Sequence, residues 1–256
     1  MTVTDGSDLW LRRFHPAPEA PVRLVCFPHA GGSATFYFPV SAALQSDCDV
    51  VALQYPGRQD RRSEPNVDDI GVLADRIAPV LEPLFDRPVV LFGHSMGAIL
   101  AFEVARRLEE KGHKPAMLFA SGRRAPSTRR VENVHQRDDD GIVAEMKAMS
   151  GTDAQVLGDE ELLRMVLPSI RSDYRAIETY GSVSVTATVA CPITALIGDA
   201  DPKSTVLEAD AWRSHTTAAF EIHTFRGGHF FLSSRAAEVI SLTREGLRSA
   251  VAVGQA

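Results

Sequence analysis

Short apolar runs alternate with longer amphipathic segments along most of this chain, and this alternation limits the possible folds more than any other feature. Six runs have the composition of buried strands, at residues 23–27, 49–53, 88–92, 116–120, 193–197 and 220–225. Several are apolar at successive positions, as expected for strands buried on both faces of a sheet. The pattern predicts an α/β fold in which helices flank a mostly parallel central sheet.

Helical periodicity fills the segment between the second and third runs. Apolar residues recur at helical spacing over residues 70–85, and Asn66 or Asp68 is available as the N-terminal cap. Pro79 and Pro83 are expected to kink or shorten this helix, because proline lacks the amide that a helix interior needs.

The strand pattern stops at about residue 126 and resumes at about residue 190. In between, residues 141–149 and 159–180 have the pattern of amphipathic helices, and a final helix is expected from about Ala236. An insertion of helices between two core strands explains this order more simply than a separate domain. We therefore predict a single domain over residues 1–256 with a helical lid insertion at about 126–189.

Charge and composition exclude several classes of protein. Among the 256 residues, 27 lysines and arginines face 33 aspartates and glutamates, and the formal charge of −6 predicts no general affinity for nucleic acid. No apolar run is long enough to cross a bilayer, so we expect a cytoplasmic protein, with a monomer as the default state. Cys26, Cys48 and Cys191 lie in apolar stretches and are expected as reduced core thiols. The histidines lack metal-ligand spacing, and we predict no metal and no cofactor.

The third apolar run ends in the sequence LFGHSMGA at residues 91–98, which contains a G-x-S-x-G pattern. In a nucleophile elbow, a serine occupies a strained turn between a strand and a helix, and small neighbours allow the two elements to approach closely. Gly93 and Gly97 meet this requirement, and a helix from Gly97 to Gly112 is expected to follow. The pattern alone also fits a polar residue in a tight turn. The flanking strand and helix favour Ser95 as a nucleophile.

A serine hydroxyl needs a general base and an acid that orients this base, in the chain order serine, acid, histidine for this arrangement. The strand that ends at Ile197 is followed by Asp199 and Asp201; we favour Asp201, with Asp199 as the alternative. After the last strand, His229 follows two glycines and is the predicted base. The other histidines are interpreted as structural: His223 within a strand, His94 in the elbow backbone, and His113, His135 and His215 at the surface.

An oxyanion hole normally uses the amide after the nucleophile and a second amide from a loop after an earlier strand. The first is Met96. The loop CFPHAGGSA follows the first core strand and contains Gly31 and Gly32, so that Ala30 is the predicted second donor. The same glycines also fit an ordinary turn, and the pattern of a phosphate-binding loop is missing. His29 is a possible substrate contact or a support for the loop.

Five segments together resemble one known family. They are FPHAGGSA, QYPGRQDRRSEP, LFGHSMGAILAFEVARRL, LPSIRSDYRAIETY, and GDADP followed by FRGGHFFL. This set is similar to the type II thioesterases of polyketide and nonribosomal peptide biosynthesis, over residues 9 to 245. The resemblance implies an α/β-hydrolase fold and an editing enzyme that hydrolyses acyl thioesters from the phosphopantetheine arm of acyl or peptidyl carrier proteins. It places the triad at Ser95, Asp201 and His229, and the oxyanion amides at Ala30 and Met96.

Carrier proteins of this kind are usually acidic, so the resemblance implies a basic docking surface. The candidate arginines are Arg58, Arg61, Arg62, Arg123, Arg124, Arg129 and Arg130, of which Arg123 and Arg124 are our main candidates for carrier or substrate contacts. Each of them also fits a solvated loop charge.

Apolar residues of the predicted lid have two interpretations, packing on the core or lining an acyl chamber. They are Leu162, Leu163, Met165, Val166, Ile170 and Ile177, and Met146 and Met149 can add an adaptable surface. Three alternative functions remain open: hydrolysis of small oxygen esters, chain release with cyclisation, and a non-catalytic ligand-binding module.

Overall fold

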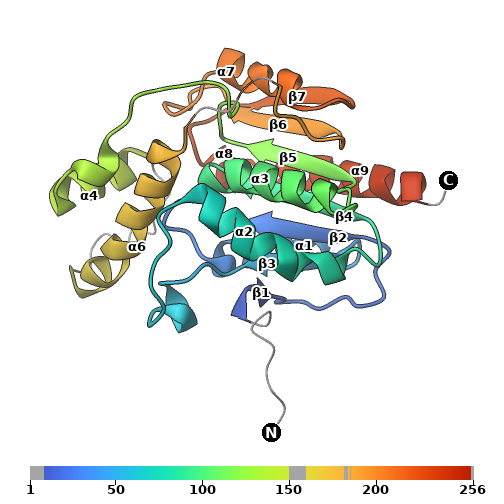
Figure 1. Ribbon diagram of the computed structural model, residues 1–256, viewed down its shortest axis with the longest axis horizontal. Helices are drawn as coiled ribbons and strands as arrows, with labels where there is room; N and C mark the ends of the chain where they lie inside the picture. The colour runs from blue at the N-terminus through green and yellow to red at the C-terminus, as the bar shows by residue number, and fades with distance from the viewer. Residues whose placement is uncertain (1–8, 150–159, 182–183, 185, 255–256) are drawn as a thin grey trace, which may run out of the picture.

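A seven-stranded sheet forms the centre of the molecule, with helices on both faces (Figure 1). The computed structural model describes residues 9–149, 160–181, 184 and 186–254. The strands are β1 Leu11–Arg12, β2 Arg23–Phe27, β3 Asp49–Leu53, β4 Val89–His94, β5 Met117–Ser121, β6 Ile193–Gly198 and β7 Phe220–Phe225. All six predicted strands are confirmed, with shifts of one or two residues at the bounds of three of them.

The strands lie in the order β1-β3-β2-β4-β5-β6-β7, and all neighbours are parallel except β1 and β3. β1 was not predicted, because a two-residue edge strand has no detectable periodicity. The direction of the chain across the sheet reverses between β2 and β4. In open α/β sheets, ligands bind beyond the carboxyl ends of the strands at such a switch point.

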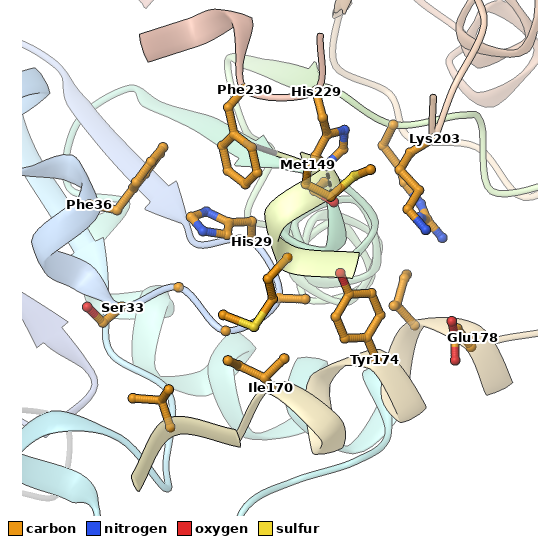
Figure 2. A pocket seen from close by; sticks show the side chains of 18 of the residues that line it. His29, Ser33, Phe36, Met149, Ile170, Tyr174, Glu178, Lys203, His229 and Phe230 are labelled. Atoms are coloured by element: carbon orange, nitrogen blue, oxygen red, sulfur yellow. Dashed lines mark hydrogen bonds between the residues drawn. The ribbon is translucent and has the colours of Figure 1, made fainter. Parts of the chain in front are cut away.

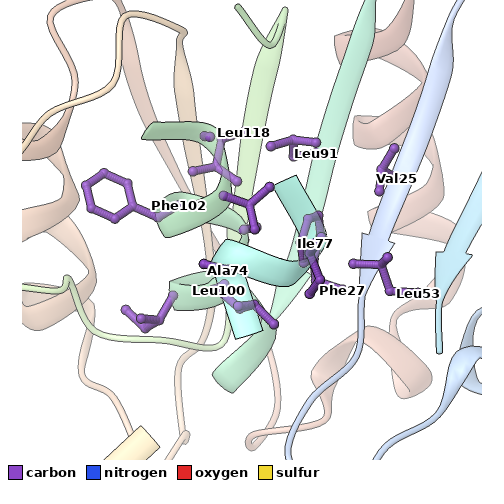
Figure 3. Packing of buried hydrophobic residues seen from close by; sticks show 14 of the residues in the cluster. Val25, Phe27, Leu53, Ala74, Ile77, Leu91, Leu100, Phe102 and Leu118 are labelled. Carbon is purple, nitrogen blue, oxygen red and sulfur yellow. The ribbon is translucent and has the colours of Figure 1, made fainter. Parts of the chain in front are cut away.

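Helices cover the two faces of the sheet around separate apolar clusters. Helices α2 Ile70–Leu81 and α3 Met96–Glu110 pack on one face, where the larger cluster lies (Figure 3). Helices α1 Phe38–Leu44 and α9 Ala236–Gly254 pack on the other. Short helices α7 Val206–Asp210 and α8 Phe231–Ser234 follow β6 and β7. Cys26, Cys48 and Cys191 are buried free thiols, as predicted.

The two ends of α2 lie close to the predicted positions, and its N-terminal cap differs from the prediction. Asp69 caps α2 through its side chain, which accepts from the amide of Val72 at 2.9 Å, so neither Asn66 nor Asp68 is the cap. Pro79 lies within α2 and Pro83 within the 3₁₀ turn Glu82–Leu84 that ends it, which confirms the predicted shortening.

The inserted segment forms a lid over the carboxyl ends of the strands. Its helices α4 Asp139–Met149 and α6 Glu160–Thr179 gather at the left of Figure 1, at one end of the sheet. The described part of this insertion also contains the 3₁₀ turn Val134–Gln136 and Val189, which forms a single-residue bridge with Thr216, a residue between β6 and β7. Among the described residues, no helix is long and apolar enough to cross a membrane.

Candidate active site

Ser95 sits in a strained turn between β4 and α3. Its φ of 55° and ψ of −119° lie in a region that non-glycine residues rarely adopt. Two glycines make this turn possible: a Cβ on Gly93 would lie 2.2 Å from the carbonyl oxygen of Gly97, and a Cβ on Gly97 would lie 2.1 Å from that of Phe27. The helix starts at Met96, one residue earlier than predicted. The strain and the two close approaches fit a nucleophile elbow.

The three predicted triad residues meet at the carboxyl ends of β4, β6 and β7. The distance from Ser95 Oγ to His229 Nε2 is 3.0 Å, and His229 Nδ1 lies 2.9 Å and 3.0 Å from the two carboxylate oxygens of Asp201. The Asp201 side chain is fully buried and that of His229 is 4% exposed. This geometry allows the histidine to take the serine proton while the carboxylate fixes the ring and stabilises its charged form.

Asp201 and Asp199, the two candidate acids, have different partners. Asp201 accepts from the amide of Lys203 at 2.8 Å in addition to its contact with His229. Asp199 is exposed and accepts from the amide of Gly227 at 2.9 Å, which fixes the loop that carries the histidine. The structure therefore brings Asp201, and not Asp199, to His229, the candidate base.

Of the two predicted oxyanion donors, Met96 directly follows Ser95 and Ala30 lines the same cavity as Ser95. Met96 is the first residue of α3, so its amide has no carbonyl acceptor within the helix. Ala30 lies in the loop after β2, next to β4 in the sheet, and lines the same cavity as Ser95. Two tyrosines fix the start of this loop by hydrogen bonds. The hydroxyl group of Tyr37 donates to the carbonyl of Phe27 at 2.9 Å, and that of Tyr55 donates to the carbonyl of Pro28 at 3.1 Å.

Two further imidazoles lie beside the triad. The ring centroid of His94 lies 5.1 Å from that of His229 and 5.9 Å from that of His29. Burial, followed by the proximity of His229, lowers the pKa of His29 to about 3 and the pKa of His94 well below its usual value. His94 Nδ1 pairs with Ser121 Oγ at 3.0 Å, and Phe230 packs on all three rings. Both extra imidazoles are therefore neutral near pH 7 and leave His229 as the candidate base.

A cavity of about 390 Å³ opens from Ser95 toward the lid (Figure 2). His29, Phe36, His229 and Phe230 line it on the scaffold side, and Ile170 and Tyr174 of α6 face them across the space. Among the predicted lid residues, those that line the cavity are Met146, Met149, Val166, Ile170 and Ile177. Leu162 and Met165 are exposed instead, with 38% and 58% of their surface accessible. The lid thus gives the cavity an apolar wall.

The structure corrects the predicted docking role of Arg123 and Arg124. Both are buried, with 8% and 5% of their surface exposed. Arg124 pairs with Glu132 and donates to the carbonyl of Lys203 at 3.0 Å. Arg123 lines the cavity, its Nε has no hydrogen-bond partner among the described residues, and burial, followed by the charge of Arg124, lowers its pKa to about 9. Arginines enclosed in this way cannot contact a protein partner at the surface.

Other arginines and one histidine also depart from the predictions. Arg58 and Arg61 are buried and Arg130 pairs with Glu208, which leaves Arg62 and Arg129 as the exposed members of the predicted set. His215 was expected at the surface but is buried, with Nδ1 2.8 Å from the carbonyl of Ala187 and Nε2 2.7 Å from Ser127 Oγ.

Asp173 on α6 was not predicted as a site residue, although it contacts the loop that carries Ala30. Its carboxylate accepts from the amide of Gly31 at 2.7 Å and from Arg58. A signal existed: Ile170, Asp173 and Ile177 share one face of the helix, so an acid stands in an apolar stripe that faces the core. Such a residue needs a buried partner.

Comparisons with known proteins agree with this geometry. Residues 22–246 match the thioesterase domain family. The "Probable cadicidin biosynthesis thioesterase" of Streptomyces griseus is 62% identical over 91% of this chain, which spans 64% of that protein. The "Thioesterase PikA5" of Streptomyces venezuelae is 48% identical over 91% of this chain and 83% of its own.

A solved structure supports the same assignment. The type II thioesterase BorB from the borrelidin biosynthetic cluster is 51% identical and superposes with a TM-score of 0.88, over 95% of this chain and 100% of that one. The predicted α/β-hydrolase fold and the resemblance noted in the sequence are thereby confirmed. The chain belongs to the thioesterase family of thioester-hydrolysing enzymes.

Proposed function

We propose that this protein is a type II thioesterase that hydrolyses acyl thioesters on the phosphopantetheine arm of acyl or peptidyl carrier proteins. One observation carries the proposal: Ser95, His229 and Asp201 form a continuous hydrogen-bonded chain at the floor of a cavity with an apolar lid wall. A hydrogen-bonded triad activates the serine, and the apolar wall suits an acyl chain.

The reaction follows from the positions of these groups. Ser95 Oγ attacks the thioester carbonyl carbon as its proton passes to His229 Nε2, and the amides of Met96 and Ala30 hold the negative oxygen. The carbon–sulfur bond then breaks, and the pantetheine sulfur leaves with the proton of His229. Water adds to the acyl-serine by the same route and releases the free acid. Because a thiolate is a good leaving group, proton donation by His229 matters less here than for an amide.

The substrate class is inferred from the similar proteins. Two of them carry names of biosynthetic thioesterases, and BorB is described as a type II thioesterase of a biosynthetic cluster. Any docking of an acidic carrier must use exposed cations, which among the predicted arginines are Arg62 and Arg129. Charge reversal at Arg129 is therefore expected to slow turnover of carrier-bound substrate and to spare small thioesters.

The test uses carrier proteins loaded with acyl groups of different length and branching. They are incubated with wild-type protein and with the Ser95→Ala variant, and intact mass reports the loss of the acyl group. We expect release by the wild type and a rate at least about 10⁴-fold lower in the variant. Hydrolysis by Ser95→Ala at the wild-type rate would disprove the mechanism. Faster hydrolysis of matched oxygen esters would favour a general esterase, and a cyclic product would indicate chain release.

A further inference from the structure

The lid helix α6 rests directly on the loop that carries the predicted oxyanion donor Ala30. Asp173 Oδ2 accepts from the backbone amide of Gly31 at 2.7 Å, across 142 residues of sequence. Ile170, one turn earlier, packs on the same glycine, because a Cβ on Gly31 would lie 2.7 Å from Ile170 Cγ1. A polar and an apolar contact from one helix therefore meet at a single residue of the loop.

The loop itself is a tight turn. The amide of Gly32 donates to the carbonyl of His29 at 2.9 Å, and Gly31 has a φ of +76°. These values fit a type II turn with Ala30 and Gly31 at its centre. Type I and type II turns differ by a flip of the central peptide, and the hydrogen bond from Gly31 to Asp173 favours one orientation of that peptide. The flip changes ψ of Ala30 and φ of Gly31, so this bond fixes ψ of Ala30 and with it the conformation of the turn that carries the Ala30 amide.

Arg58, in the loop after β3, binds both Asp173 and the turn that contains Gly31 and Gly32. Its Nη1 and Nη2 bind the two carboxylate oxygens of Asp173 at 2.6 Å and 2.8 Å, and Nη1 also donates to the carbonyl of Gly32 at 3.0 Å. The side chains of Asp173 and Arg58 are 1% and 8% exposed. The pair thus holds Gly31 by its amide and Gly32 by its carbonyl, on both sides of one peptide group.

A contribution to the stability of the fold is a weak explanation for the buried ion pair between Arg58 and Asp173. A buried ion pair loses the hydration of both charges, and an apolar pair of the same size is often equally stable. A bidentate pair does provide fixed geometry, because the planar guanidinium sets the orientation of the carboxylate. Here the oriented carboxylate is the acceptor for the amide next to Ala30.

We propose that Asp173, held by Arg58, is a positioning residue through which the seated lid helix completes the oxyanion hole. This inference rests on the proposed function and adds a condition to it. The loop holds the Ala30 amide in the catalytic orientation only when α6 is in place. The lid therefore supplies part of the catalytic geometry in addition to one wall of the acyl cavity.

The test compares Asp173→Asn with a matched variant of the same helix. Ser169 lies one turn from Asp173, is 5% exposed and donates to the carbonyl of Gly57 at 2.6 Å, so Ser169→Ala removes a bond from α6 to the scaffold without touching the oxyanion loop. Steady-state rates are measured on acetyl and octanoyl thioesters. For Asp173→Asn we expect kcat to fall about 30-fold on both substrates with KM changed less than about 2-fold, which is less than the loss of an oxyanion donor itself. Ser169→Ala is expected to keep kcat within about 2-fold of wild type.

Equal effects of the two variants would overturn the proposal, as would a loss in Asp173→Asn that affects KM for the octanoyl substrate alone. Either result would mean that Asp173 only anchors the lid. If Asp173→Asn does not fold, as judged by its thermal unfolding, Arg58→Lys replaces it. Lysine keeps the charge but cannot bind two carboxylate oxygens and the Gly32 carbonyl together. We expect kcat about 5-fold lower for Arg58→Lys, and an unchanged kcat would count against the proposal.

A second measurement separates this inference from the proposed function. A fluorophosphonate probe phosphonylates an activated serine with loss of fluoride, and its P=O oxygen occupies the oxyanion hole during the reaction. Slower labelling of Ser95 in Asp173→Asn than in Ser169→Ala supports the positioning role even if the wild type hydrolyses no thioester. Equal labelling rates in these two variants would contradict it while leaving the thioesterase assignment intact.

Discussion

The two walls of the cavity are built differently. The scaffold wall, formed by Ser95, His229 and His29, comes from loops at the ends of parallel strands and is held by backbone geometry and hydrogen bonds. The lid wall is formed by side chains of α4 and α6, which contact the scaffold through ion pairs such as Arg58–Asp173 and Lys203–Glu145 and through apolar residues such as Ile177. The positions of Ser95 and His229 are therefore set by the strands and loops of the scaffold, whereas the side chains that line the lid wall can be substituted without altering that scaffold.

The largest expected effect lies on the scaffold wall and tests how strictly one acid is required. Asp201→Asn should lower kcat about 10³–10⁴-fold, because an amide cannot hold the histidine in its active tautomer or stabilise its charged form. Asp199→Asn is the matched control, two residues away in the same loop, and should stay within about 3-fold of wild type. Steady-state kinetics on one small thioester distinguish the two. Comparable losses would show that the acid role is shared.

Much of the scaffold wall could be predicted because its signals are local. The elbow needs glycines at fixed distances from Ser95, and the positions of Asp201 and His229 follow from the ends of two apolar runs. The same rules placed the strands to within one or two residues. The two-residue strand β1 could not be found, because it exists only through its pairing with β3.

The lid wall was predicted less well because its contacts join distant parts of the sequence. Arg124 has the sequence pattern of a solvated loop charge, but it is buried, pairs with Glu132 and donates to the carbonyl of Lys203, which is 79 residues away in the sequence. Asp173 is buried through contacts with Gly31 and Arg58, which lie 142 and 115 residues away in the sequence. Hydrophobic periodicity identifies the faces of a helix, but it does not identify the partner of a buried charge.

A second prediction tests the backbone of the scaffold wall. Gly93→Ala places a Cβ 2.2 Å from the carbonyl oxygen of Gly97, and neither backbone segment can move without displacing Ser95. We expect a loss of roughly 3 kcal/mol or more in the free energy of unfolding, measured in urea. Gly112→Ala is the control, because its Cβ meets nothing within 4 Å. Its φ of +84° should cost only about 1 kcal/mol. Similar losses in both variants would show that steric contact at the elbow is not decisive.

A third prediction tests the selectivity of the lid wall. Val166 lines the cavity, and its neighbour Met165 is 58% exposed and does not. Val166→Phe should lower kcat/KM for an octanoyl thioester about 10-fold and for an acetyl thioester by less than about 2-fold, because the ring occupies space that only the longer chain needs. Met165→Phe should change neither value. A uniform loss on both substrates would instead place Val166 close to the reacting atoms.

Acid should affect the two walls at different pH, with the smallest effects of this series. The pKa of His29 is lowered from its usual 6.5 to about 3 by burial and then by His229. Between these two pKa values the unfolded chain binds a proton at His29 that the folded protein does not bind. The free energy of unfolding therefore falls as the pH is lowered from 6.5 to 3. The pKa of Glu132 is lowered from 4.5 to about 2, since Arg124 and Lys203 outweigh the opposing effect of burial. Its contribution is lost only below pH 4.5.

Thermal unfolding midpoints between pH 7 and 3 separate these two windows. His29→Gln should flatten the decline between pH 6.5 and 4.5, and Glu132→Gln should flatten it only below pH 4.5, each by a few degrees. The reason is that glutamine does not titrate, so neither variant has a difference in proton binding between the folded and unfolded states at the substituted position. If Glu132→Gln already flattened the curve near pH 6, the lid ion pairs would be sensitive to the protonation of nearby histidines, and the acid responses of the two walls would be coupled.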